Sequence, residues 1–103
     1  MNQRLLNKVA IITGAGSGIG RETSLLFLEE GAKVILADIN EATLEETMNL
    51  ASQNGLKDNA VSVITDVSLE TAIEAMVKTA IDEFGKLDIL FNNAGLGGAF
   101  GSI

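Results

Sequence analysis

The stretch Lys8–Gly20, KVAIITGAGSGIG, places a run of apolar and β-branched residues directly before a turn with four alternating glycines. An apolar run bounded by glycine predicts a buried strand over Lys8–Thr13. Residues 18–30 follow with the apolar spacing of a helix. The predicted inner face of this helix holds Ile19, Thr23, Leu26 and Phe27. The stretch therefore predicts a strand, a glycine-rich turn and a helix in succession.

The same alternation continues along the chain. Further strands are predicted over residues 33–37, 60–65 and 87–92, and further helices over residues 41–53 and after Ser68. Asn40 and Ser68 are the predicted N-caps of those helices. Strands that alternate with helices favour a parallel sheet, here a Rossmann-like, doubly wound α/β fold with strand order 3-2-1-4 and three helices. We expect one partial dinucleotide-binding domain over residues 1–103, with residues 96–103 as a glycine-rich tail.

The composition excludes several classes of function. Asp and Glu total 14 against 7 Lys and Arg, a net charge of −7, which argues against binding to nucleic acid or to an anionic membrane surface. The chain has no Cys and no His, so we expect no metal site built from thiolates or imidazoles and no cysteine nucleophile. It has no apolar run long enough for a membrane span or a secretory signal, so we expect a cytoplasmic protein.

The glycine-rich turn has the properties that a diphosphate requires. Gly14 can form the tight turn, and Gly18 and Gly20 permit close approach of the backbone. The helix that follows offers free N–H groups and a partial positive charge. The spacing T-G-x-x-x-G-x-G differs from both G-x-G-x-x-G and the Walker pattern. A flexible turn without a ligand is the alternative, and Ser17 could bind phosphate or cap the helix.

Asp38 ends the second strand, 18 residues after Gly20. An acid at about this distance is placed to accept hydrogen bonds from the adenosine ribose, which favours NAD over NADP. Neighbouring Ile39 and Asn40 offer no guanidinium for a 2′-phosphate. A helix cap is the alternative role for Asp38, although Asn40 fills that position. Arg21 could reach a phosphate, but we expect a solvated helix residue.

Together these residues resemble the short-chain dehydrogenase/reductase family, with its T-G-x-x-x-G-x-G turn at Gly14–Gly20. Asp66-Val67 looks like the pair that borders the adenine ring, and Asn92-Asn93-Ala94-Gly95 looks like the N-N-A-G motif. Asp66 could instead only start a turn, and the two asparagines could only serve a tight turn. The candidate cofactor-binding residues are Gly14, Ser17, Gly18, Ile19, Gly20, Asp38, Ile39, Asp66, Val67, Asn92, Ala94 and Gly95.

The resemblance also implies what this chain lacks. The family's catalytic Tyr and Lys, with a Ser and an Asn, lie beyond the N-N-A-G motif, and this chain contains no Tyr. We therefore expect the N-terminal part of an NAD-dependent oxidoreductase of alcohols and ketones, with no catalytic residue and no activity alone. The alternatives are a stand-alone nucleotide-binding module and a pseudo-enzyme scaffold that pairs another chain onto the fourth strand. The substrate and any homo-oligomer are left open.

The fourth strand carries a further expectation. Ile89, Leu90 and Phe91 are consecutive apolar residues, which is typical of a strand buried on both faces of a sheet. At the edge of a four-stranded sheet, however, this strand would expose apolar surface and unpaired backbone groups.

Overall fold

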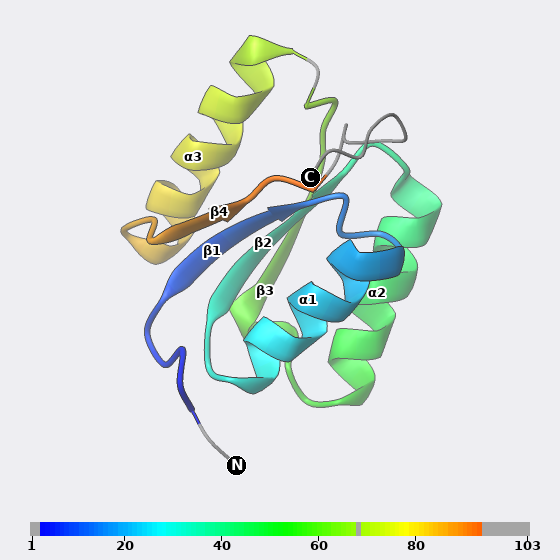
Figure 1. Cartoon of the computed structure of the whole chain (residues 1–103), viewed down its shortest axis with the longest axis vertical. Coiled ribbons are helices and arrows are strands. Elements are labelled where there is room, and N and C mark those ends of the chain that lie inside the picture. Colours follow the sequence, from blue (N-terminus) through cyan, green and yellow to red (C-terminus); the bar gives the residue numbers. More distant parts are fainter. Residues whose placement is uncertain (1–2, 68, 94–103) are drawn as a thin grey trace.

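The computed structural model describes residues 3–67 and 69–93, and a parallel sheet of four strands forms its centre (Figure 1). The strands are β1 (Val9–Thr13), β2 (Lys33–Asp38), β3 (Ala60–Ile64) and β4 (Ile89–Phe91). Their order is β3-β2-β1-β4, which confirms the predicted doubly wound topology. In a parallel sheet of this order the carboxyl ends of all four strands lie along one edge, where ligands bind in such folds.

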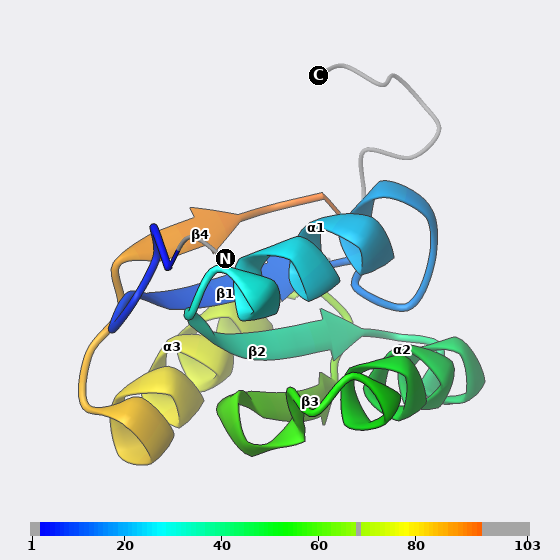
Figure 2. The same ribbon diagram turned by 90° about the horizontal axis from the view of Figure 1, so that it is seen from below.

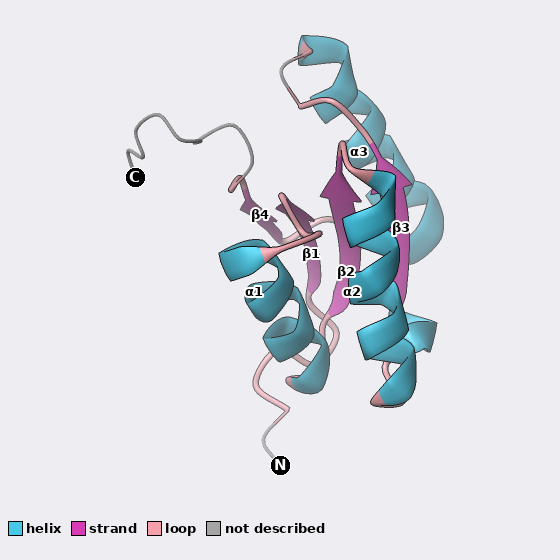
Figure 3. Ribbon diagram, turned by 90° about the vertical axis from the view of Figure 1, so that its right-hand side faces the viewer, coloured by secondary structure: helices cyan, strands magenta, loops and turns pink. Residues whose placement is uncertain are grey.

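In the described ranges, three α-helices cover the sheet, two on one face and one on the other. They are α1 (Gly18–Glu29), α2 (Glu41–Gln53) and α3 (Glu70–Phe84). Figures 2 and 3 show α1 and α2 on one side of the sheet and α3 on the opposite side. A short 3-10 helix, η1 (Lys57–Asn59), precedes β3 and was not predicted.

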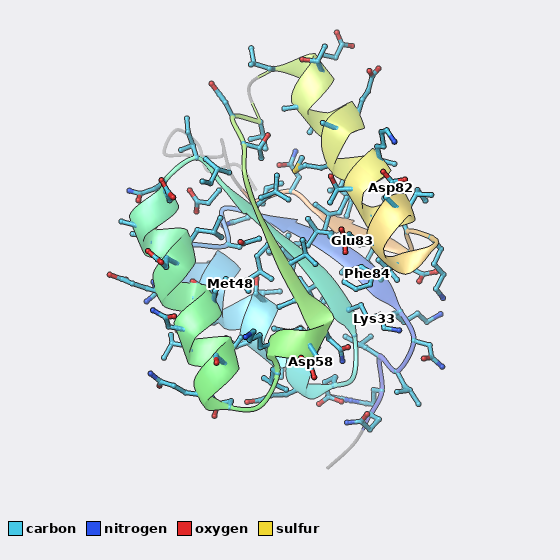
Figure 4. All side chains as sticks on the ribbon, turned by 180° about the vertical axis from the view of Figure 1, so that it is seen from behind. Lys33, Met48, Asp58, Asp82, Glu83 and Phe84 are labelled. Carbon is cyan, nitrogen blue, oxygen red and sulfur yellow. The ribbon has the colours of Figure 1, made fainter. Side chains whose placement is uncertain are left out.

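Each face of the sheet has its own apolar core. Ile12, Val34 and Leu36 point toward α1 and α2 and contact Leu28 and Leu44. On the other face, Val9, Ile11, Ile35 and Ala37 contact Met76 and Ala80 of α3. All five residues of β1 are buried, as expected for a central parallel strand. Met48 and Phe84, labelled in Figure 4, are half-buried against the first and the second core.

The inner face predicted for α1 was wrong. Ile19 is 66% exposed and Leu26 is 50% exposed. The buried residues of α1 are instead Gly20, Ser24 and Leu28, which are four residues apart. The Ser24 hydroxyl donates to the Gly20 carbonyl at 2.7 Å, which satisfies the buried side chain within the helix. Because small residues let the helix approach the sheet closely, apolar spacing alone assigned the wrong face.

The bounds of every predicted element except the second helix differ by one or two residues from those observed, as at α3 and β4. The N-cap of α3 is Leu69, which makes no side-chain cap hydrogen bond, and the predicted cap Ser68 lies outside the described residues. The strand β4 is shorter than the predicted 87–92. The Asp88 carboxylate accepts from the Val9 N–H at 2.9 Å, so a side chain replaces the backbone partner that a longer strand would offer.

The exposed edge expected at β4 is present in the described part of the chain. β4 pairs with β1 alone, and Leu90 at its centre is 45% exposed. None of the helices in the described ranges is long and apolar enough to cross a membrane. The predicted tail 96–103 falls outside the described residues.

Candidate functional site

The glycine turn between β1 and α1 depends on three of its glycines, two for their backbone conformation and one for close packing. Gly14 has φ 68° and Gly18 has φ 58°, a backbone conformation that other residues adopt only with strain. Among the described residues, no atom other than those of its chain neighbours and its own helix backbone lies within 4 Å of a hypothetical Cβ on Gly18, so its backbone borders open space. At Gly20 a Cβ would overlap the Gly14 carbonyl oxygen, so this glycine permits the helix to meet the end of β1.

In the described part of the chain, no side chain caps the first turn of α1. Ser17 occupies the N-cap position with extended backbone, but its hydroxyl makes no cap hydrogen bond, and no acidic residue lies in the first turn. Ser17, Gly18 and Ile19 are all exposed. The first N–H groups of any helix have no partner inside the helix and carry the positive end of its dipole. The exposed end of α1 can therefore accept an anion.

The Asp38 carboxylate lies against this turn. One of its oxygens, Oδ2, accepts from the Gly16 N–H at 2.8 Å, and Oδ1 accepts from the Asn40 N–H at 3.0 Å. Asn40 is the N-cap of α2, because its side chain accepts from the Thr43 N–H at 3.1 Å. Asp38 is therefore free of the capping role that was its alternative, and its side chain is half-buried. The adjacent Ile39 is 65% exposed.

Asp66 and Val67 follow β3 at the same edge of the sheet. The Thr65 N–H donates to the Asp38 carbonyl at 2.9 Å, which brings this segment beside the end of β2. The Leu69 N–H donates to the Asp66 carbonyl at 3.1 Å, so Asp66 begins a turn, as its alternative reading expected. Val67 is half-buried and packs against the α3 core. A turn and a place beside the adenine ring are compatible roles.

A hydrogen-bonded threonine joins the end of β4 to the start of the glycine turn. The buried Thr13 hydroxyl donates to Asn92 Oδ1 at 2.9 Å and accepts from the Asn93 N–H at 2.8 Å. Asn92 therefore has a structural role at this point, whatever its role toward a ligand. The predicted site residues Ala94 and Gly95 lie outside the described residues.

Arg21 is not the solvated helix residue that was expected. Its side chain is only 26% exposed. Its Nε donates to Thr47 Oγ1 at 2.9 Å, and its Nη2 donates to the Gly16 carbonyl at 2.6 Å. The prediction failed because Thr47 is 26 residues away in sequence, and only the packing of α1 against α2 brings the two together.

Sequence reasoning also left Thr13, Gly16, Arg21 and Thr47 out of the candidate site. Thr13 and Gly16 stand inside the glycine motif, so their position was a usable signal. Thr47 has no such signal, because a threonine on a helix is ordinary until its surroundings are known.

Among the described residues, no three Cys, His, Asp or Glu side chains gather in a way that could hold a metal ion.

Comparison with known proteins gives a consistent family. Residues 8–102 match the family model described as short chain dehydrogenase. A short chain dehydrogenase/reductase of Aspergillus oryzae is 48% identical over 93 residues, which are 89% of this chain and 35% of that relative. The chain thus spans about a third of the length of this curated relative.

Solved structures agree with the fold. The apo form of the glucose dehydrogenase of Caenorhabditis elegans superposes with TM-score 0.85 and 45% identity, over 89% of this chain and 39% of that one. A short chain dehydrogenase/reductase from Burkholderia phymatum, solved in complex with NAD, superposes with TM-score 0.78 and 37% identity, over 84% of this chain and 30% of that one.

Proposed function

Because the chain belongs to the short chain dehydrogenase family, we propose that it forms the NAD-binding N-terminal part of an oxidoreductase. The complete protein would transfer hydride between NAD and an alcohol or ketone. The complex of the Burkholderia phymatum relative with NAD supports a nicotinamide cofactor. A cytoplasmic location and a homo-oligomeric assembly remain predictions.

The observation that carries the proposal is the position of the Asp38 carboxylate beside the uncapped end of α1. The Gly16 N–H holds this carboxylate against the turn, while Ser17, Gly18 and Ile19 stay exposed on the adjoining side. A diphosphate at the exposed amides would place an adenosine ribose toward the end of β2. The described residues thus fit a dinucleotide at both of its recognition points.

The hydrogen-bonding capacity of Asp38 also suits a ribose. An ionised carboxylate has about four acceptor positions. Backbone N–H groups of Gly16 and Asn40 occupy two of them. The remaining capacity matches the two hydroxyls of an unmodified ribose. When NAD is bound, its nicotinamide ring supplies the hydride acceptor.

The same carboxylate disfavours NADP. A 2′-phosphate near Asp38 would place two like charges close together, at a cost of about 1 to 4 kcal/mol for charges 4 Å apart, depending on the effective dielectric constant. Since 1.4 kcal/mol is a factor of ten, this cost corresponds to binding of NAD that is tighter than that of NADP by about fivefold to several hundredfold. This chain holds neither His, Cys nor Tyr, so we propose that it contributes cofactor binding and not proton transfer.

Calorimetric titration of the complete protein with NAD and with NADP tests the proposal. We expect Asp38→Ala to weaken NAD binding about tenfold and to narrow the preference over NADP, in line with loss of hydrogen bonds to a charged group. Asp58→Ala is the matched control, because Asp58 is exposed and precedes β3 at the opposite edge of the sheet (Figure 4). Unchanged NAD affinity in Asp38→Ala, or a wild-type preference for NADP, would contradict the proposal.

A further inference from the structure

The two turn residues that precede Ser17 are held on every side. All four backbone polar groups of Ala15 and Gly16 have hydrogen-bond partners. The Ala15 N–H donates to the Ala37 carbonyl at 3.0 Å, and the Ala15 carbonyl accepts from Thr47 Oγ1 at 2.9 Å. The Gly16 N–H donates to Asp38 Oδ2 at 2.8 Å, and the Gly16 carbonyl accepts from Arg21 Nη2 at 2.6 Å. The two peptide planes on either side of the Gly16 Cα are thereby fixed.

Arg21 and Thr47 act as one unit in this network. The Thr47 hydroxyl is fully buried, and it accepts from Arg21 Nε at 2.9 Å while it donates to the Ala15 carbonyl. Arg21 Nη2 also reaches the Thr43 carbonyl at 3.2 Å and the Glu46 carboxylate at 2.9 Å. The guanidinium therefore ties the turn to two successive helical turns of α2.

The network meets the candidate ribose site at Gly16. A Cβ on Gly16 would lie 2.7 Å from Asp38 Oδ2 and 3.1 Å from the Leu44 nitrogen, so the turn packs directly on the carboxylate. A displacement of the turn would carry the Gly16 N–H away from Asp38. One of the two hydrogen bonds that orient the carboxylate therefore comes from the turn that Arg21 and Thr47 hold, and the other comes from the Asn40 N–H. The cofactor itself need not touch Arg21 or Thr47.

We propose that Arg21 and Thr47 are positioning residues that fix the Asp38 carboxylate and thereby set the preference for NAD over NADP. This inference rests on the proposed function, because it assigns to Asp38 the binding of the ribose. A purely structural role for the same two residues would change the stability of the fold and leave the relative affinity for the two cofactors unchanged.

The experiment compares two pairs of variants in the complete protein. Thr47→Val removes the hydroxyl at nearly constant volume, and Thr47→Ser restores it. Arg21→Met keeps the apolar stem without the donors, and Arg4→Met is its control, since Arg4 pairs with Glu30 near the N-terminus. Dissociation constants for NAD and NADP are measured by calorimetry, and melting temperatures are measured in parallel.

We expect Thr47→Val and Arg21→Met each to raise the dissociation constant for NAD about five- to tenfold, as for weakened hydrogen bonds between the ribose and a displaced Asp38 carboxylate. The constant for NADP should change less, so the preference narrows. Thr47→Ser and Arg4→Met should keep the wild-type ratio. Lowered melting temperatures with an unchanged ratio in both Thr47→Val and Arg21→Met would overturn the inference. Failure of the proposed function would show differently, as NAD binding that is indifferent to Asp38→Ala.

Discussion

Replacement of Gly20 by alanine tests whether α1 must touch the end of β1. A Cβ at residue 20 would overlap the Gly14 carbonyl oxygen and lie 2.6 Å from the Gly14 carbonyl carbon. Carbon atoms in contact are normally about 3.5 to 4.0 Å apart. The crowding atoms belong to backbone and cannot rotate away, so α1 would have to move by about 1 Å to restore such a contact.

Two opposing effects set the change in the free energy of unfolding for Gly20→Ala. Overpacking costs about 1 to 3 kcal/mol, and a backbone neighbour places Gly20→Ala at the upper end of this range. Alanine is about 1 kcal/mol more favourable than glycine within a helix. We therefore expect a net loss of about 2 kcal/mol in the free energy of unfolding. Because the moved helix carries the amides of the candidate site, NAD affinity should fall as well.

Urea unfolding followed by circular dichroism, together with calorimetric titration of NAD, measures both effects. Gly55→Ala is the control, because Gly55 has φ 74° with no neighbour within 4 Å of a Cβ and lies after α2, away from the glycine turn. It should lose about 1 kcal/mol from strain alone and bind NAD normally. A loss below about 0.5 kcal/mol in Gly20→Ala, the size typical of surface substitutions, would show that α1 tolerates a side chain at this contact and would contradict the prediction.

Three other predictions concern hydrogen bonds at the edges of the sheet and helices. Thr13→Val removes the hydroxyl that donates to Asn92 Oδ1 and should lower the free energy of unfolding by about 2 kcal/mol. In the same urea titration, Thr13→Ser should have nearly the wild-type free energy of unfolding. The hydrogen bond from the Val9 N–H holds the pKa of Asp88 below its ordinary value of 3.8. The ionised carboxylate therefore stabilises the folded state fully above pH 3.8, and this stabilisation is lost as the pH falls through the lowered pKa. Urea midpoints between pH 7 and pH 2 should show this loss, and Asp88→Asn should flatten it. Asn40→Ala removes the N-cap of α2 and should cost about 1 kcal/mol, whereas Asn40→Asp should unfold at nearly the wild-type urea concentration.

The periodicity of apolar residues in strands and helices predicted most of the fold. The four strands, the three helices and the order β3-β2-β1-β4 follow from apolar runs that alternate with helical stripes. The α2 boundaries were predicted without error, because Asn40 and Gly55 mark both ends with residues that suit caps and turns. The buried face of α1 was misassigned, because Gly20 and Ser24 are buried for their small size and not for their hydrophobicity.

The glycine turn and Asp38 could be predicted as parts of one site, since both stand at the ends of neighbouring parallel strands. How Asp38 is held could not be predicted. Its bond to the Gly16 N–H joins residues 22 positions apart, and the support from Arg21 and Thr47 comes from helix packing. No local sequence pattern predicts which acceptor the side chain of a helical arginine will bind.

The order of residue types along the chain thus determined the layers, the strand order and the place of the turn, because local periodicity distinguishes strands from helices and shows that they alternate. The polar groups that meet at the carboxyl edge are determined by how the helices pack on the sheet and on each other. Hydrogen bonds such as that between Arg21 and Thr47 are sensitive to changes of a few tenths of an ångström in the distance between donor and acceptor. That distance is set by how closely the two helices and the sheet pack.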